Sequence, residues 1–206
     1  MRLLSLLAIA VSFAASADEE RTLKVVSSKS LPAIESVLVY ASESIKPGKD
    51  RPKPIFVWKF DKGVTSDATT TLGEGPFHIT VKPKDGIEVL VATKLNIKPG
   101  QTHELKLGDL LGVVEVFQKE GFPKVDRIVL TAPDDSGPDE KGHVAVQVGS
   151  DYRVEMPVTE GFYAVWLVPA NGARAQRIEE RLRVLPGKNV RVGELGVRGL
   201  CGRATR

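Results

Sequence analysis

The sequence predicts an exported, all-β protein with two tandem small β-sandwich modules. Three observations lead to this prediction. Short runs rich in Val, Ile, Phe and Tyr alternate with turn dipeptides, one pattern of glycines, prolines and apolar residues occurs twice, and the chain opens with an apolar leader. Runs of this length and composition are typical of strands, and regularly spaced turns favour a sandwich over alternating strands and helices.

The N-terminus reads as a cleaved signal peptide over residues 1–17. Met1-Arg2 supplies one positive charge, the run 3–14 is apolar except for two serines, and Ala15-Ser16-Ala17 offers small residues for cleavage after Ala17. The run is too short to span a bilayer, which takes about 20 residues. A buried N-terminal helix is the alternative, but no capping residues accompany the run. We therefore expect a periplasmic or secreted protein.

Charge and cysteine content exclude some classes of protein. The 206 residues contain 29 Lys and Arg against 26 Asp and Glu, a net charge of +3. This near balance gives no electrostatic reason to expect nucleic acid or an anionic membrane as partner. Cys201 is the only cysteine, so no intramolecular disulfide can form and the fold must depend on its hydrophobic core. Cys201 is either an inert thiol or a residue that pairs between chains.

Strand-like runs fill most of the chain after the leader. They are residues 55–60, 77–81, 88–91, 113–117, 127–130, 144–148, 152–156 and 163–168. The turns between them are marked by Asp85-Gly86, Pro99-Gly100, Asn171-Gly172 and Pro186-Gly187. Two segments are ambiguous: 31–39, which could form a short turn, and 173–183.

An internal repeat with a period of about 86 residues sets the predicted domain boundaries. When Gly75 is placed against Gly161, Phe77 meets Tyr163, and the turn prolines, turn glycines and inward apolar positions coincide further along. The first module is predicted over 26–111, the second over 112–199, and a short tail over 200–206. The joint at 107–112 is rich in Leu and poor in Pro and Ser, which predicts a tight connection and not a flexible linker.

The segment Pro157-Val158-Thr159-Glu160-Gly161-Phe162-Tyr163-Ala164-Val165 has a proline, a small spacer, Gly-x-Tyr and then an alternating strand. It resembles the signature of prealbumin-like sandwiches, which include carboxypeptidase regulatory-like and collagen-binding-protein B-type repeats. The segment 72–77 matches less well. The resemblance implies a spacer, stalk or binding module. The enzymes of that fold use His clusters or Tyr and His ligands, and neither set has matching motifs here.

No catalytic, cofactor-binding or metal-binding residues are predicted. His78, His103 and His143 are scattered over the two modules without the spacing of metal ligands, and one cysteine adds too little for zinc. We find no Gly-x-Ser-x-Gly motif and no phosphate-binding glycine loop. We therefore expect no cofactor and no enzymatic activity.

Two loops remain open as binding sites. Residues 134–140 contain four carboxylates, a composition that can bind calcium, although the spacing is not that of an EF-hand. Residues 43–54 contain Lys46, Lys49, Arg51 and Lys53, which could contact acidic glycans or a partner. In both cases a solvated surface loop is the simpler interpretation.

Phe56, Trp58 and Phe60 share one side of a predicted strand, with Val57 and Lys59 on the other. We interpret the aromatic side as core, and Trp166 likewise. The expected function is an exported, non-enzymatic structural or protein-binding module of the bacterial envelope, with a protein or glycan as partner and no membrane segment after cleavage. The alternatives are a carbohydrate-binding accessory module that uses Trp58, and a metal-dependent hydrolase.

Overall fold

The structure is a computed structural model that describes residues 20–42, 52–60, 67–84, 88–117, 125–138, 144–147 and 153–193; of 144–147 it describes the backbone only. The predicted signal peptide, the tail 200–206, His143 and Cys201 lie outside the described residues. The described residues form fourteen strands and one short 3-10 helix (Leu107–Asp109), with no α-helix among them. The predicted all-β class is therefore confirmed.

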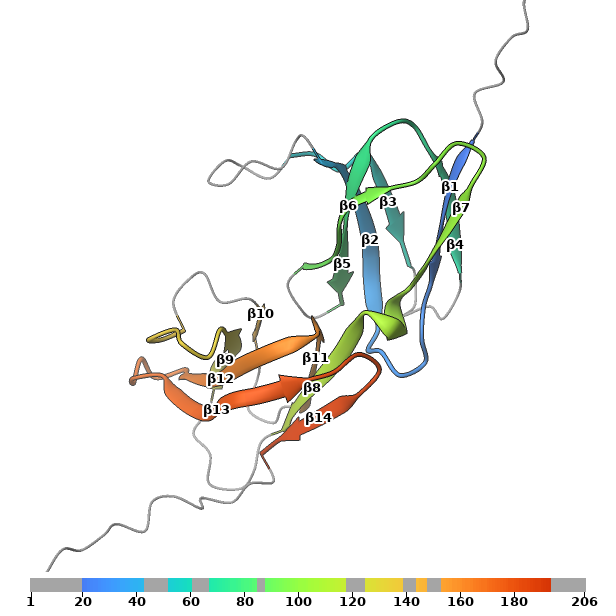
Figure 1. The fold of residues 1–206 in the computed structure, drawn as a ribbon. Helices are drawn as coiled ribbons and strands as arrows, with labels where there is room; N and C mark the ends of the chain where they lie inside the picture. The colour runs from blue at the N-terminus through green and yellow to red at the C-terminus, as the bar shows by residue number, and fades with distance from the viewer. Residues whose placement is uncertain are drawn as a thin grey trace, which may run out of the picture.

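The first half of the fold contains a three-stranded and a four-stranded sheet, drawn in blue to green in Figure 1. The sheet orders are β4-β1-β7 and β3-β2-β5-β6. The strands are β1 (Arg21–Val26), β2 (Ile34–Ala41), β3 (Phe56–Lys59), β4 (Ala68–Leu72), β5 (Pro76–Pro83), β6 (Val89–Asn96) and β7 (Thr102–Lys106).

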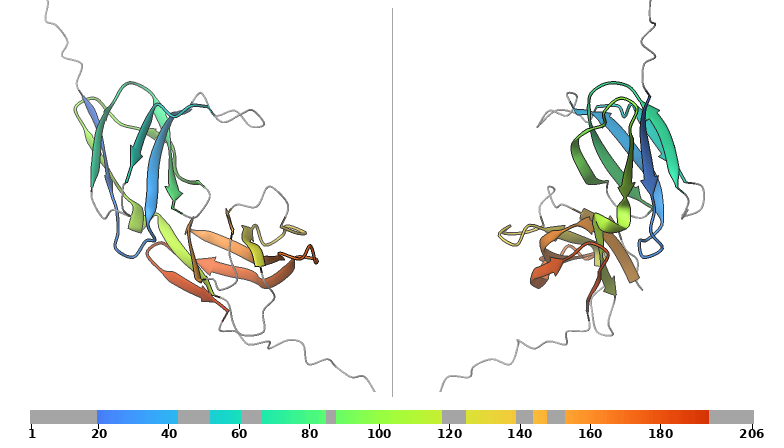
Figure 2. Two further views of the ribbon diagram at one scale, coloured as in Figure 1. Left: turned by 180° about the vertical axis from the view of Figure 1, so that it is seen from behind. Right: turned by 45° about the vertical axis from the view of Figure 1, so that its right-hand side comes forward.

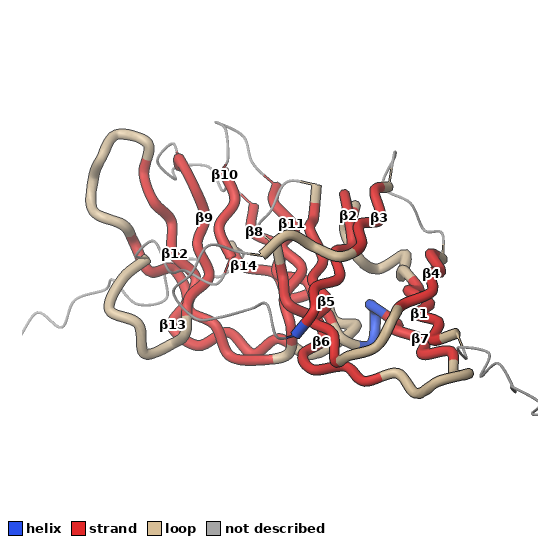
Figure 3. Tube along the Cα trace, turned by 90° about the horizontal axis from the view of Figure 1, so that it is seen from above, coloured by secondary structure: helices blue, strands red, loops and turns tan. Residues whose placement is uncertain are grey.

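The second half contains sheets with the orders β11-β8-β14 and β10-β9-β12-β13. Its strands are β8 (Leu111–Phe117), β9 (Val125–Thr131), β10 (Val144–Gln147), β11 (Arg153–Thr159), β12 (Gly161–Pro169), β13 (Gln176–Val184) and β14 (Asn189–Val192). Seen from above, the strands of the two halves occupy opposite ends of the molecule (Figure 3).

The two halves share one scheme of strand pairing. In each, the first strand pairs antiparallel with the fourth and parallel with the seventh, so that β1 lies between β4 and β7 as β8 lies between β11 and β14. The register shifts at Ile79 between β5 and β6, and at Val165 between β12 and β13. Gly100 and Gly187, which follow the two turn prolines, both have the positive φ that glycine tolerates (72° and 66°). Origin by duplication stays a prediction.

The hydrophobic core is continuous between the halves. One cluster of buried side chains includes Leu23, Phe77 and Ile79 from the first half and Leu130 and Val165 from the second. Leu107 and Leu111, at the joint, are buried in the same cluster. As the sequence predicted, the joint is buried and not an exposed linker.

The joint is also held by close backbone contacts with the turn before β14. Gly187 donates its N–H to the Leu111 carbonyl at 2.9 Å, and Val113 donates to the Lys188 carbonyl at the same distance. A Cβ on Gly112 would collide with the Leu185 carbonyl and lie 2.5 Å from Val184 Cγ1. Figure 2 shows the two halves meeting at this point.

The structure defines strands in three places that the sequence left approximate or ambiguous. Strand β1 begins at Arg21 and β8 at Leu111, close to the approximate module starts at 26 and 112. Segment 31–39, left ambiguous with a short turn as one reading, is largely strand β2, and the register shift between Ile34 and Ser36 interrupts the alternation that would have revealed it. Segment 173–183 is largely strand β13, whose position at the edge of its sheet accommodates its many charged residues.

Candidate functional site

Four large apolar side chains are exposed among the described residues: Ile55, Val57, Leu90 and Phe162, at 53%, 38%, 48% and 45%. Exposure alternates along 52–60, which places Ile55 and Val57 on the outer face of the sheet β3-β2-β5-β6. Leu90 lies on the same face, and Phe162 faces a pocket that Leu90 also lines. Contiguous exposed apolar surface of this kind is the usual mark of an interaction site.

The strand register places four side chains of this outer face in one line across the sheet. Val57 is opposite Leu38, Leu38 is opposite Thr80, and Thr80 is opposite Leu90. We call these four residues the outer row. Thr80 is itself buried and its hydroxyl donates to the Glu88 carboxylate, so the exposed members of the row are Val57 and Leu90 at its two ends. The row thus crosses all four strands, from edge strand β3 to edge strand β6.

The outer row ends at a pocket between the two halves, with a volume of about 480 Å³. Glu88 and Leu90 line it from the first half, and Val158, Thr159, Phe162 and Tyr163 from the second. Because Leu90 belongs to both, the pocket continues the row.

The polar group at the edge of the pocket is fixed by neighbours on the sheet. The Glu88 carboxylate accepts hydrogen bonds from the Tyr40 hydroxyl at 2.9 Å and from the Thr80 hydroxyl. Both donors lie on the outer face, so they hold the carboxylate at the junction of row and pocket. Charge-assisted bonds of this type are stronger than neutral ones.

The opposite wall of the pocket is fixed by Tyr163. Its hydroxyl donates to the carbonyl of Thr159 at 2.9 Å, across the tight turn between β11 and β12. A Cβ on Gly161 would lie 3.4 Å from the Tyr163 ring, in ordinary van der Waals contact. The hydrogen bond to Thr159 thus fixes the ring in the wall of the pocket.

One side of the outer row is basic. The neighbouring line across the sheet is Lys59, Ser36 and Lys82, which are in register with one another. We call these three residues the lysine row. Lys82 pairs with Glu35 at 2.8 Å, whereas Lys59 is exposed and has no carboxylate partner among the described residues. On its other side the outer row borders Tyr40 and His78, which are hydrogen-bonded to Glu88, just before β6, and to Ser42, just after β2.

The corresponding position on the second half is covered. There Trp166 occupies the place of Thr80 and is opposite Val129 and Arg177. The indole N–H donates to Thr131 Oγ1 at 3.1 Å, and the Arg177 guanidinium covers the ring at 4.4 Å from its centre. Arg177 also donates to the Asp135 carbonyl at 2.6 Å. Trp166 is thus buried, as predicted, but on the outer face and under an arginine.

One pair of side chains has the composition of a nucleophile and its base. Ser42 Oγ lies 2.8 Å from His78 Nε2, and His78 is buried. The Nδ1 atom, which an orienting carboxylate would bind in a catalytic triad, has no hydrogen-bond partner among the described residues. The pair is also absent from the lining of the pocket. Sequence analysis missed it because the Tyr40–His78 register, which brings Ser42 near, is not visible in the sequence.

The remaining sites considered from the sequence are accounted for as follows. The described residues contain no group of three or more His, Cys, Asp or Glu side chains able to hold a metal ion. His103 lies on β7, outside the pocket lining. Of the acidic loop, Asp135 accepts a hydrogen bond from the Ala132 N–H at 3.0 Å, and Asp139 and Glu140 lie outside the described residues. Most of the basic loop, residues 43–51, also lies outside the described residues.

The aromatic strip of β3 faces inward, as the sequence predicted. Phe56 and Trp58 are opposite Val39 and Val37, and both are half-buried against the core cluster. Their rings meet edge to face, with centroids 4.7 Å apart. These rings therefore do not form an exposed platform for a sugar.

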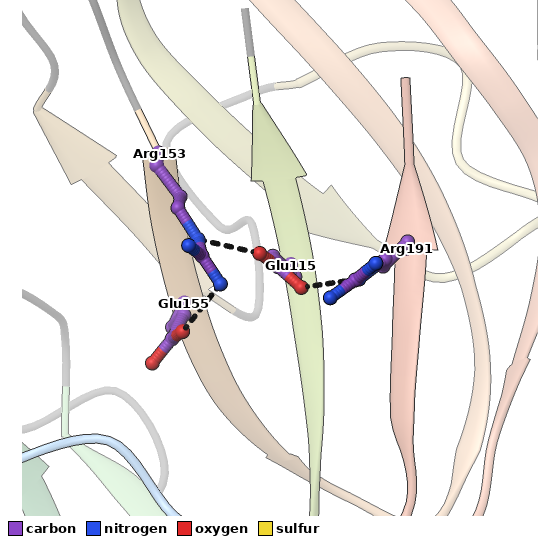
Figure 4. A network of polar contacts seen from close by, with 4 residues as sticks. All are labelled: Glu115, Arg153, Glu155 and Arg191. Atoms are coloured by element: carbon purple, nitrogen blue, oxygen red, sulfur yellow. Dashed lines mark hydrogen bonds and ion pairs between the residues drawn. The ribbon is translucent and has the colours of Figure 1, made fainter. Parts of the chain in front are cut away.

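A second cluster of charges lies on the outer face of β11-β8-β14 and is shown in Figure 4. Glu115 Oε1 and Oε2 are 2.6 and 2.8 Å from the Nε atoms of Arg153 and Arg191. Burial alone would raise the pKa of the Glu115 carboxyl, but the two arginines outweigh it and hold the pKa below its usual value. The network neutralises a buried carboxylate and so stabilises the sheet.

Comparison with known proteins gives little further information. No protein-family model matches the chain, and no curated protein matches it. Among solved structures, the Bacillus anthracis TIE protein is similar at 13% identity and a TM-score of 0.30, over 84% of this chain and 33% of that one. A leucine-rich repeat protein from Bacteroides thetaiotaomicron is similar at 11% identity and a TM-score of 0.23, over 84% of this chain and 26% of that one. This chain therefore spans about a third of the first protein and a quarter of the second. Similarity this low carries no argument about fold or function.

Helices long and apolar enough to cross a membrane are absent from the part of the chain that the structure describes.

Proposed function

We propose that this chain is an exported, non-enzymatic β-sandwich-like module of the bacterial envelope that binds another protein. The observation that carries the proposal is the pair of exposed aliphatic side chains at the two ends of the outer row, Val57 and Leu90, with the pocket beside Leu90. Export rests on the leader sequence alone, with cleavage after Ala17.

The difference between the halves makes the exposed row informative. At the positions equivalent to Thr80 and Leu90 the second half has Trp166 and Arg177, so the sheet scheme does not itself require an exposed aliphatic side chain there. Burying a Val or Leu side chain fully is worth about 1.5–3 kcal/mol. A partner that covers Val57 and Leu90 would regain part of this free energy.

The carbohydrate alternative is less well supported by the side chains involved. Sugar sites stack the ligand on exposed aromatic faces, whereas Phe56 and Trp58 pack on the core and the exposed row is aliphatic. The enzyme alternative has the Ser42–His78 pair in its favour, but a third residue bound to Nδ1 is missing among the described residues.

Site-specific photocrosslinking in the producing cell tests the proposal. A photoreactive phenylalanine analogue at Leu90 or Val57 should give one defined protein adduct, and the analogue at Glu180, exposed on edge strand β13, should give none. Equal adducts at all three positions, or none at Leu90 and Val57, would refute the protein-binding proposal. N-terminal sequencing of the exported form should find Asp18 first, and an intact leader would refute export with cleavage.

A further inference from the structure

We infer that the partner binds through one continuous segment, whose large apolar side chains lie on the outer row and enter the pocket and whose carboxylates face the lysine row. This inference rests on the proposed function and specifies the chemistry of the partner. It draws on the register of four strands, on the charge beside them, and on the pocket at one end.

The geometry favours a single segment over scattered contacts. Neighbouring strands are about 4.8 Å apart, so a line across four strands spans about 14 Å, roughly the length of three turns of helix or of four to five extended residues. Leu90 lies at the end of this line and also lines the pocket. A segment that covers Val57 and follows the row across the sheet therefore ends at the pocket.

The pocket is suited to an apolar anchor. Its walls include Leu90, Val158 and Phe162, and a volume of about 480 Å³ accommodates more than one large side chain. Phe162 is exposed, and its ring is stacked by the Arg181 guanidinium at 4.7 Å, which fixes its orientation. Buried anchors in preformed pockets usually dominate the affinity of an interface.

The charge beside the row selects the partner. Lys59 is exposed and has no carboxylate partner among the described residues, and Lys82 is half-exposed beside its Glu35 partner. On the opposite side, Tyr40 donates to Glu88 and His78 is hydrogen-bonded to Ser42. Carboxylates on one side of the partner segment would therefore meet cations, and carboxylates on the other side would not. Such charge complementarity sets orientation and specificity more than raw affinity.

Only one site of this kind is present in the described residues. The corresponding position on the second half is filled by Trp166 under Arg177. We therefore expect one segment bound per chain.

Selection from a random twelve-residue peptide library displayed on phage, against the full immobilised chain, tests the inference. Enriched peptides should carry Leu, Phe or Trp together with Asp or Glu. One enriched peptide, synthesised with a fluorescent label, should bind the chain one to one by fluorescence anisotropy. Failure to enrich any peptide, or enrichment of peptides without carboxylates, would overturn the inference.

Matched variants separate the inference from the proposed function. Lys59→Glu should weaken the affinity for the labelled peptide roughly three- to tenfold, since surface charge pairs contribute modestly. Lys98→Glu, an equal charge change on the exposed turn after β6, should leave it unchanged. Leu90→Ser should weaken binding further, with thermal unfolding used to show that each variant is folded.

Four results decide the question. Loss with both Leu90→Ser and Lys59→Glu supports the inference. Loss with Leu90→Ser but not with Lys59→Glu means that the row binds without charge selection, so the inference fails and the proposed function stands. Unchanged binding in both variants places the peptide elsewhere and removes the support for both. Dimerisation of the chain that Leu90→Ser abolishes would show a second copy as the occupant and also overturn the inference.

Discussion

Lys24 and Glu115 occupy the same place in the two halves of the fold and carry opposite charges. Each is on the outer face of the central strand of a three-stranded sheet, and each lies between two residues of the opposite sign. Lys24 is 3.1 Å from Asp67 and 3.8 Å from Glu104. Glu115 lies between Arg153 and Arg191 in the same way (Figure 4). The arrangement of the three side chains is thus the same in both halves, but each charge has the opposite sign.

The two clusters differ in burial, so they should differ in their effect on stability. Glu115 has a side chain only 7% exposed, whereas that of Lys24 is 34% exposed. Glu115→Gln should lower the free energy of unfolding by about 1–2 kcal/mol, less than for a fully buried pair because both arginines are largely exposed. Urea unfolding at about pH 7 measures this. Glu155→Gln, which removes only a 3.8 Å contact with Arg153, is the matched control and should change little.

The same carboxyl predicts a pH dependence. The folded-state pKa of Glu115 lies below its ordinary value of 4.5, so the folded state binds this proton less readily than the unfolded state does. Its stabilising contribution is therefore present above pH 4.5 and is lost as the pH falls through the folded pKa. The stability difference between the native chain and Glu115→Gln should shrink over that window. A difference that stays constant down to about pH 3 would contradict the assignment.

The pKa of Lys24 is shifted in the opposite direction, so its pH dependence is reversed. Asp67, and then Glu104, raise the pKa of this amine above its ordinary value of 10.5. Its contribution is present below pH 10.5 and is lost as the pH rises through the folded pKa. Because all three groups are substantially exposed, we expect Lys24→Gln to have a smaller effect than Glu115→Gln in the same urea experiment.

Gly112→Ala should disturb the joint between the halves. The added methyl group would collide with the Leu185 carbonyl and with Val184, and backbone cannot move aside as a flexible side chain can. Overpacking of this kind costs about 1–3 kcal/mol. Gly73→Ala is the control, since a Cβ there meets no atom within 4 Å. Thermal unfolding should show a lower midpoint for Gly112→Ala than for Gly73→Ala. Equal midpoints would mean that the backbone of the joint shifts to accommodate the added methyl group.

Local patterns in the sequence were sufficient for the fold class and for the orientation of β3. The alternation of Phe56, Val57, Trp58 and Lys59 is short-range, and the aromatic residues do face the core while Val57 and Lys59 face outward. The turn glycines at 100 and 187 were equally visible, because positive φ restricts the choice of residue.

The candidate site was not predictable in the same way. The outer row unites residues from four strands, and the pairings of β2 with β3 and with β5 that bring Val57 and Leu38 beside Thr80 join segments far apart in the sequence. Thr80 and Trp166 occupy corresponding positions, yet Arg177 extends over Trp166 from the edge strand β13, whereas Leu90 is exposed beside Thr80. Such closure depends on pairing between distant segments, which sequence periodicity does not specify.

The hydroxyl and the ring of Tyr163 should contribute separately to stability. Tyr163→Phe removes the bond to the Thr159 carbonyl and should cost about 0.5–1.5 kcal/mol. Tyr163→Ala also removes a buried ring and should cost about 3–5 kcal/mol. In the first half Phe77 occupies the matching position without a hydroxyl, so the ring itself is expected to matter more. Urea unfolding of both variants checks the order, and equal losses would contradict it.

Removal of the arginine that covers Trp166 should give the second half an exposed face like that of the first. Arg177→Ala deletes the guanidinium that lies 4.4 Å from the centre of the indole ring and binds the Asp135 carbonyl, so water should reach Trp166. We expect a red shift of tryptophan emission and stronger acrylamide quenching, measured in a Trp58→Phe background so that Trp166 alone reports. The cation–π contact is worth about 0.5–1 kcal/mol, so the variant should remain folded. Arg181→Ala, which uncovers Phe162 instead, is the matched control and should leave the emission unchanged. Unchanged emission in Arg177→Ala would mean that other side chains close this face, and the contrast between the two halves would then no longer support the outer row as the binding surface.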